Sequence, residues 1–514
     1  MIRRLGWDIR KPHPARRLCA PVLGVFLLAS AALPWGCIQP EPEPLSDTEL
    51  AGFWSGSFRI LGDSVQLVLE LAPTDSGTLS GRISLPAQSI FDLPAATVRR
   101  GREVEVDVGS VGGRYEGRLD RDGASIRGDW LQSGGLFRLD LIPTATPPQP
   151  PRPQEPQPPF PYRAESVLIP HPDGQVILSG TLTIPREEGP HPGVVLVSGS
   201  GPQDRDESLF GHRPFLVLAD YLTRSGIAVL RYDDRGVAES TGDFANATTE
   251  DLASDALAAV HYLVGYEGID PMRVGINGHS EGGIVAPMAA TRSDRVAFIV
   301  ALAGTGISGR NLMELQTRLI LEASELPAPV IELNRRLQER VLDMLMEAGS
   351  SEGALDLAKQ ELEASWAGLP YAALTALGMA AQMDRAMEEQ LRRIASPWLF
   401  FFLEFDPSTA FERVQVPVLA LNGSLDLQVP PEPNLRLIGE ALKRGGNRDV
   451  TTMELEGLNH LFQTAVTGLP SEYGRIEETV APVVLQTVAD WILTRSPRSG
   501  GEGSVQPSSE DGTR

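Results

Sequence analysis

No helix or sheet can run through residues 143–161, because ten of these nineteen residues are proline (PTATPPQPPRPQEPQPPFP). Proline has no backbone N–H to donate, and its ring clashes with the preceding turn of a helix. A chain interrupted in this way must fold separately on the two sides of the interruption. We therefore predict two folded domains joined by a semi-rigid polyproline linker.

The first 37 residues have the layout of an export signal. Six basic residues and one acidic residue in positions 1–17 precede a sixteen-residue apolar run, 18–33, and the ending PWGC. The run is shorter than the ~20 residues of a membrane-spanning helix. Gly36–Cys37 resembles, imperfectly, the end of a bacterial lipoprotein signal. We predict an exported protein held at the periplasmic or outer face of a membrane by lipid on Cys37; a simple cleaved signal and an uncleaved anchor are the alternatives.

Composition excludes several classes of function. The chain has two cysteines, Cys19 and Cys37, and both lie in this signal. A disulfide framework, a cysteine zinc site and a catalytic cysteine are therefore excluded from the folded body. Acidic residues outnumber basic residues by 67 to 45, which gives a net charge of −22. A net negative charge of this size repels the phosphate backbone of nucleic acids, so we predict no nucleic-acid partner.

Residues 48–142 alternate between apolar and polar side chains with the period of a β-strand. Val65, Leu67 and Leu69 follow this period, and turn sequences such as TDSG, VGG and DRDG recur at short intervals. We predict a small all-β sandwich or barrel of seven or eight antiparallel strands. The segment contains no histidine and no group of residues suited to catalysis, so we interpret it as a structural or binding module of unknown ligand.

After the proline-rich segment, apolar strands alternate with amphipathic helices. Three such strands cover residues 193–201, 227–236 and 273–283. The alternation predicts an α/β domain, with a mostly parallel sheet covered by helices on both faces. We expect this domain to span 162–494 and to be followed by a polar, disordered tail at 495–514.

The sequence Gly278-His279-Ser280-Glu281-Gly282 follows the third of these strands and fits the pattern G-x-S-x-G. Where a strand turns sharply into a helix, glycines two residues before and two after leave room for a strained serine. The serine hydroxyl is then exposed at the carboxyl edge of the sheet. We predict that Ser280 is a nucleophile; a chance match is disfavoured because a strand precedes the pattern and small residues follow it.

A serine nucleophile needs a general base and an acid that orients the base. Of the seven histidines, only His460 lies downstream of Ser280, in a loop before the closing helix 477–493. Asp426 follows the strand-like sequence VPVLALNG and lies between them in the chain. The order serine, acid, histidine is the order of α/β-hydrolases. A surface histidine and a turn aspartate are the alternatives, and Glu456 is the next candidate acid.

Residues 162–494 resemble the α/β-hydrolase superfamily and, within it, the bacterial EstD-like carboxylesterases. The matching motifs occur in order along the domain: GTLTIP, SGSGPQDRDE, GHRPFLVLADYLTRSGIAVLRYDDRG, GHSEGG, SPWLFFFLEFDP, LNGSLDLQVP and LNHLFQ. The resemblance implies a β-rich N-terminal domain and a catalytic triad of Ser280, Asp426 and His460. Ala238 departs from the family, in which glycine is usual at this position of the turn.

Acyl transfer also needs two backbone amides that face the oxygen on which negative charge develops. We predict the amide of Glu281, directly after the nucleophile, and the amide of Ser200 in the turn SGSG, with Gly201 as the neighbouring alternative. The charged residues beside this turn are expected to form a structural ion-pair cluster of Asp204, Arg205, Asp206 and Arg235.

An insertion of about 110 residues, at about 307–413, has a helical pattern that the sheet does not require. We predict that it forms a helical cap over the active site. Its aromatic residues, Trp398 and the run 400–402, either belong to the core or line an acyl pocket.

Together these residues predict a serine carboxylesterase that cleaves small or medium acyl esters through an acyl-enzyme on Ser280, without a metal or organic cofactor. The expected partners are a small-molecule ester and, through lipid alone, a membrane. A serine peptidase or thioesterase on the same residues is the first alternative. A non-catalytic binding lipoprotein with a vestigial hydrolase domain is the second, and the presence of all three triad residues disfavours it.

We predict that the wild-type protein fractionates with membranes and carries a diacylglyceryl group on Cys37, whereas Cys37→Ser is soluble. Two acyl chains hold a protein at a bilayer, while one chain binds only marginally. Membrane fractionation with intact-mass analysis of the N-terminus tests this, and Cys19→Ser is the control that should change neither result. A soluble wild type with an unmodified N-terminus beyond Cys37 would refute lipidation.

Overall fold

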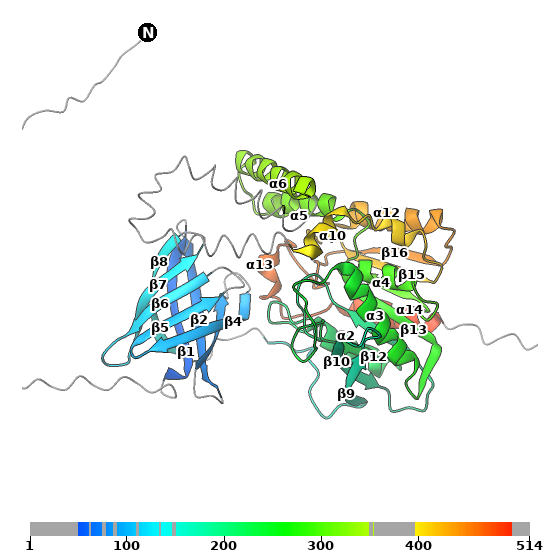
Figure 1. Ribbon diagram of the computed structural model, residues 1–514, viewed down its shortest axis with the longest axis horizontal. Coiled ribbons are helices and arrows are strands. Elements are labelled where there is room, and N and C mark those ends of the chain that lie inside the picture. The colour runs from blue at the N-terminus through cyan, green and yellow to red at the C-terminus, as the bar shows by residue number, and fades with distance from the viewer. Residues whose placement is uncertain are drawn as a thin grey trace, which may run out of the picture. The chain divides into compact units, whose positions relative to one another are not determined.

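The computed structural model describes two ranges of residues, 50–145 and 151–495, with gaps at 61–62, 75–78, 86–89, 109–112, 133–134, 349–352 and 354–395. The export signal with Cys37, much of the predicted cap and the tail beyond Arg495 lie outside the described residues. No helix in the described part is long and apolar enough to span a bilayer. The chain forms an all-β domain, coloured blue to cyan, and an α/β domain, coloured teal to red (Figure 1).

The all-β domain is a closed barrel of eight antiparallel strands. Each strand pairs with the next in the chain, and β1 closes the barrel against β8. The strands are β1 (Gly52–Ile60), β2 (Asp63–Pro73), β3 (Leu79–Leu85), β4 (Ile90–Arg100), β5 (Glu103–Val108), β6 (Gly113–Leu119), β7 (Ile126–Gln132) and β8 (Gly135–Thr144). Of the two predicted forms, sandwich and barrel, the barrel is the one observed.

Alternation along each strand builds the interior of this barrel. In β5, Val104 and Val106 are buried, while the residues between and beside them are more exposed. Trp130 and Tyr115 are the largest fully buried side chains of the domain. The Tyr115 hydroxyl donates to the carbonyl oxygen of Ile126 at 2.8 Å, which satisfies its polar group inside the apolar core.

The α/β domain is built on an eight-stranded sheet in the order β16-β15-β14-β13-β11-β12-β10-β9. The six strands from β16 to β12 are parallel, while β10 and β9 pair antiparallel at one edge. The strands are β9 (Arg163–Pro170), β10 (Ile177–Ile184), β11 (His191–Val197), β12 (Ala228–Tyr232), β13 (Ile269–His279), β14 (Ile299–Leu302), β15 (Val418–Gly423) and β16 (Val450–Leu455). The predicted mostly parallel sheet is confirmed.

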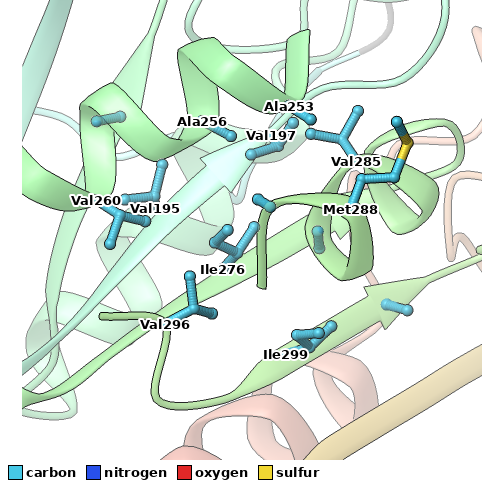
Figure 2. Close-up of a cluster of buried hydrophobic side chains, with 14 of the residues drawn as sticks. Val195, Val197, Ala253, Ala256, Val260, Ile276, Val285, Met288, Val296 and Ile299 are labelled. Atoms are coloured by element: carbon cyan, nitrogen blue, oxygen red, sulfur yellow. The ribbon is translucent and has the colours of Figure 1, made fainter. Parts of the chain in front are cut away.

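Helices cover both faces of this sheet (Figure 1). On one face lie α3 (Thr249–Val264), α4 (Gly282–Ala290), α11 (Ser408–Phe411) and α12 (Pro431–Arg444), and on the other lie α2 (Pro214–Arg224) and α14 (Pro482–Thr494). The remaining helices of the described residues are α5 (Gly309–Ala323), α6 (Ala328–Ala348), α10 (Pro397–Glu404) and α13 (Pro470–Tyr473). In Figure 2, valines of β11 and Ile276 of β13 pack beneath Ala253 and Ala256 of α3, whose small side chains let the helix approach the sheet closely.

Part of the proline-rich segment is bound to the α/β domain. The Arg152 guanidinium donates to the carbonyl oxygens of Gly474 at 2.8 Å and Ile476 at 2.6 Å. The Gln154 amide donates to the carbonyl oxygen of Val480 at 2.7 Å. The polar side chains between the prolines therefore anchor this stretch of the expected linker to the segment that follows the His460 loop.

The turn after β13 has the strained backbone that the sequence predicts. Ser280 has φ of +53°, in the left-handed region that non-glycine residues rarely adopt. A Cβ atom added at Gly278 would lie 1.9 Å from the carbonyl oxygen of Gly282, and one added at Gly282 would lie 2.2 Å from that of Val197. Close approach of backbone to backbone therefore requires both glycines.

We predict that Gly278→Ala lowers the free energy of unfolding by about 3 kcal/mol, because its methyl group overlaps an immobile carbonyl group. The matched control is Gly439→Ala in α12, where an added Cβ atom meets one side-chain atom at 3.6 Å. Helix propensity should make that change stabilising by about 0.5–1 kcal/mol. Urea denaturation measures both, and equal stabilities of the two variants would show that the turn tolerates a side chain.

Candidate active site

Four loops meet at the carboxyl edge of the sheet, because the strands that precede them run parallel. They are the loop after β11 at 198–207, the turn after β13 with Ser280, the loop after β15 with Asp426, and the loop after β16 with His460. The sequence order and the sheet order together bring all three predicted triad residues to one edge. Such an edge is where α/β sheets place their ligand sites.

Asp426 and His460 are hydrogen-bonded to each other. His460 Nδ1 lies 2.9 Å from Asp426 Oδ2, and both side chains are buried. Asp426 Oδ1 accepts hydrogen bonds from the backbone N–H groups of Gln428 at 2.9 Å and Val429 at 2.8 Å. The carboxylate is thus fixed from the other side, and it orients the imidazole so that Nε2 is the ring nitrogen available for proton transfer.

Ser280 is half-buried, and its amide donates to the carbonyl oxygen of Leu302 at 2.8 Å. Within the described residues, no hydrogen bond joins its hydroxyl to His460. The link between the two is made by the neighbouring residue, since His279 Nε2 donates to the carbonyl oxygen of His460 at 3.0 Å and the two rings lie 4.9 Å apart. The contact between nucleophile and base often tightens only when substrate binds.

A buried Glu207–His279 pair lies beneath these loops. His279 Nδ1 is 2.8 Å from Glu207 Oε1, and because both ring nitrogens face acceptors, both carry a hydrogen atom. Burial by itself lowers the pKa of His279, but the adjacent Glu207 carboxylate outweighs burial and raises that pKa above its ordinary value. Glu207 could not be predicted as a site residue from the sequence, because an acid eight residues beyond Gly199 in a charged loop matches no spacing rule.

The loop after β11 packs directly against Ser280. A Cβ atom added at Gly199 would lie 3.2 Å from Ser280 Cβ. The Gly199 amide donates to Glu207 Oε1 at 2.8 Å and is therefore occupied. In the described chain, the amides of Ser200, Gly201 and Glu281 donate no hydrogen bond to other protein groups, so the predicted oxyanion donors are available.

Asp234 fixes the other part of this loop. Its carboxyl group accepts hydrogen bonds from the Ser198 hydroxyl at 3.1 Å and from the backbone N–H of Gln203 at 2.9 Å. Burial raises the pKa of Asp234 to about 8; these two hydrogen bonds oppose the rise, and the nearby Asp255 and Glu281 carboxylates add to it. An acid with this pKa is mostly protonated at neutral pH, so Asp234 holds the loop by hydrogen bonds and not by charge.

The prediction that Arg235 pairs with the charged residues of this loop is wrong. Arg205 pairs with Asp233, with Nε 3.0 Å from Oδ1, and Asp206 pairs with Arg231. Arg235 instead binds the buried Asp255 of α3 through two nitrogens at 2.7 and 2.8 Å. A bidentate bond to a buried carboxylate is stronger than a single contact at the loop, which is why Arg235 turns toward α3.

The described part of the predicted cap contacts the turn that carries Ser280. Trp398 of α10 stacks on Phe402 at 5.2 Å between ring centroids, and its indole Nε1 donates to Glu281 Oε1 at 2.8 Å. Phe402 is buried in the core, while Trp398, Phe400 and Phe401 are half-buried. Among the described residues, no group of three or more His, Cys, Asp or Glu side chains could hold a metal ion.

Known proteins resemble this chain over the same region. The family model for X-Pro dipeptidyl-peptidases (S15 family) matches residues 173–451, more than half of the 514-residue chain. The chain belongs to this family. It is also 28% identical over 335 residues to Esterase EstD of Thermotoga maritima, a match that covers 62% of this chain and 65% of that esterase, slightly less than two thirds of its length.

Solved structures with a similar arrangement include an esterase of Pyrococcus furiosus, PF2001, at 16% identity, covering 57% of this chain and 82% of that chain with a TM-score of 0.35. The α/β hydrolase GrgF of Penicillium sp. sh18 is 19% identical and covers 58% of this chain and 91% of that chain, with a TM-score of 0.36. The S15-family match and the EstD match, together with the sheet, confirm the predicted α/β-hydrolase fold and the resemblance to EstD. The chain therefore has the α/β-hydrolase fold.

We predict that Glu207→Gln lowers the free energy of unfolding by about 3 kcal/mol at pH 6, because it leaves the buried His279 without its counter-charge. The folded-state pKa of His279 is raised, so the stabilising pair is complete below the unfolded pKa of ~6.5 and is lost as the pH rises through the folded pKa. The loss caused by Glu207→Gln should therefore shrink at high pH.

The matched control is Glu239→Gln, which removes a carboxylate of the same neighbourhood that is 73% exposed and paired with Arg205. An exposed pair contributes about 0–1 kcal/mol, so this variant should remain close to wild type at every pH. Denaturation at pH 6 and pH 9 compares the two. A loss for Glu207→Gln that is the same at both pH values, or no larger than that for Glu239→Gln, would exclude a charged His279.

Proposed function

We propose that the protein is a serine carboxylesterase that acts through an acyl-enzyme on Ser280. The observation that carries the proposal is the buried Asp426–His460 hydrogen bond of 2.9 Å at the same sheet edge as the strained Ser280 turn. The esterase name of the relative from Thermotoga maritima supports ester cleavage in particular. Small or medium acyl esters are the proposed substrates.

In the proposed mechanism, Ser280 Oγ attacks the ester carbonyl carbon while its proton passes to His460 Nε2. Asp426 holds the imidazole and stabilises the imidazolium that forms. The carbonyl oxygen becomes negative and accepts hydrogen bonds from the amides of Glu281 and Ser200. His460 then returns the proton to the departing alkoxide, which leaves as the alcohol, and the acyl group remains on Ser280. A water molecule attacks in the same way and releases the carboxylic acid.

Peptide cleavage is the second candidate function, because the matched family is described as X-Pro dipeptidyl-peptidases. The same groups can run both reactions, although an amine leaving group depends more on protonation by His460. Substrates distinguish the two: p-nitrophenyl esters of graded chain length test the first, and an X-Pro p-nitroanilide tests the second. Acyl thioesters tested beside them cover the remaining alternative on the same triad.

We also propose that the hydrolase acts outside the cytoplasm, at the periplasmic or outer face of a membrane. The support is the charged-apolar-small layout of residues 1–37, which ends in Cys37. Lipid on this cysteine would hold the enzyme at the membrane surface.

We predict that a fluorophosphonate labels the wild-type protein at Ser280 and that Ser280→Ala is neither labelled nor active. Asp426→Asn should retain the fold but lose about 10⁴-fold in kcat, as in other serine triads, because His460 then adopts the wrong tautomer. Mass spectrometry of the labelled peptide and p-nitrophenyl ester kinetics give the two readouts.

The control for the acid is Glu456→Gln, since Glu456 is the other candidate of the sequence and its side chain is exposed. It should keep wild-type kcat. Strong ester turnover by a folded Ser280→Ala protein would overturn the nucleophile, and an inactive Glu456→Gln beside an active Asp426→Asn would reassign the acid.

A further inference from the structure

The side chain of Glu281 joins three parts of the α/β domain. It is 2% exposed, and its Oε1 accepts from the Thr249 hydroxyl at 2.7 Å and from the Trp398 indole at 2.8 Å. Thr249 is the first residue of α3, and Trp398 is the second residue of α10, in the cap. Glu281 itself lies between the nucleophile and α4, so one carboxylate oxygen connects the nucleophile turn to both helices.

These two hydrogen bonds are the main compensation for burying the Glu281 carboxylate. Burial raises the pKa of Glu281, and the hydrogen bonds from Thr249 and Trp398, with a smaller one from the Ser200 side chain, oppose that rise. No basic side chain of the described chain forms an ion pair with it. A buried carboxylate that has no cation and loses a donor must rotate, take up a proton or admit water.

We propose that Trp398 is a positioning residue for hydrolysis, because its N–H fixes the Glu281 side chain and thereby the Glu281 amide that faces the oxyanion. The inference rests on the proposed function, in which that amide is one of the two oxyanion donors. It makes docking of α10 a condition for efficient chemistry, so the cap takes part in the reaction as well as covering the site.

The amide of Glu281 is sensitive to its own side chain because both belong to one residue in a strained turn. The preceding residue, Ser280, is held at φ of +53°. Rotation of a side chain bonded on both sides alters the backbone of such a turn, and a shift of 1 Å in an active site can cost about 10²-fold in rate. Loss of an oxyanion donor costs about 10²–10³-fold in kcat.

Trp398→Phe separates the hydrogen bond from the packing, because phenylalanine keeps an aromatic ring that can stack on Phe402 and lacks the N–H. The matched control is Trp491→Phe in α14. The Trp491 indole is buried against Phe298, and its Nε1 has no hydrogen-bond partner among the described groups. The same substitution there removes no hydrogen bond.

The experiment measures kcat and KM for a p-nitrophenyl ester, and the rate at which a fluorophosphonate labels Ser280. In labelling, the Ser280 Oγ–P bond forms as the P–F bond breaks, the serine proton goes to His460, and the phosphoryl oxygen occupies the oxyanion position. We expect Trp398→Phe to lower kcat and the labelling rate by about tenfold or more, with KM within about twofold. Trp491→Phe should match wild type.

A double-mutant cycle tests whether Trp398 acts through Glu281. Glu281→Leu keeps the backbone amide and removes the acceptor, so adding Trp398→Phe to it should cost nothing further. Glu281→Gln keeps an acceptor oxygen, so adding Trp398→Phe to it should still lower kcat. Wild-type kcat and labelling in a folded Trp398→Phe protein, or costs that multiply in the double variant, would overturn the role of Trp398. A wild-type protein that is neither labelled nor active would overturn the proposed function instead, and the inference with it.

Discussion

A buried ion pair between Glu207 and His279 holds the candidate active site together. One oxygen of Glu207 accepts from both His279 and the Gly199 amide, and the other ring nitrogen of His279 donates to the carbonyl oxygen of His460. The pair therefore connects the loop after β11, the turn with Ser280 and the loop with His460. Removing one partner of such a buried pair is costly, about 3–5 kcal/mol, because a charge remains without compensation.

Other acidic side chains fix the loops around this pair. Asp233 and Asp234, which follow β12, accept hydrogen bonds from the loop at 198–207. Asp426 accepts from two backbone amides and also orients His460. Glu281 accepts a hydrogen bond from Trp398 and so links α10 to the turn with Ser280. Each of these carboxylates has donors on a neighbouring element, so the site is pre-organised by acids that bridge between loops.

Local patterns in the sequence predicted the parts of this site that depend on backbone geometry. Glycine spacing located the Ser280 turn, and the order of strands placed Asp426 and His460 at one edge of the sheet. Side-chain pairing between distant elements was not predictable in this way. Arg235 pairs with Asp255 of α3. Arg152 binds the carbonyl oxygen of Ile476 and so anchors a proline-rich segment that the sequence predicts to be a linker. Ala238 has φ of +46°, in the left-handed region that favours glycine, which fits the glycine that the resemblance to EstD-like esterases implies at this turn.

The protonation state of His279 decides whether a buried ion pair with Glu207 holds these loops together. Nitrogen-15 NMR of histidine-labelled protein, with the His279 signals assigned by their loss in His279→Gln, reports whether each ring nitrogen carries a hydrogen. If the ion pair is present, both nitrogens of His279 are protonated at pH 7. Free histidine, with an ordinary pKa of ~6.5, is mostly neutral at that pH. A neutral His279 with one bare ring nitrogen at pH 7 would contradict the ion pair.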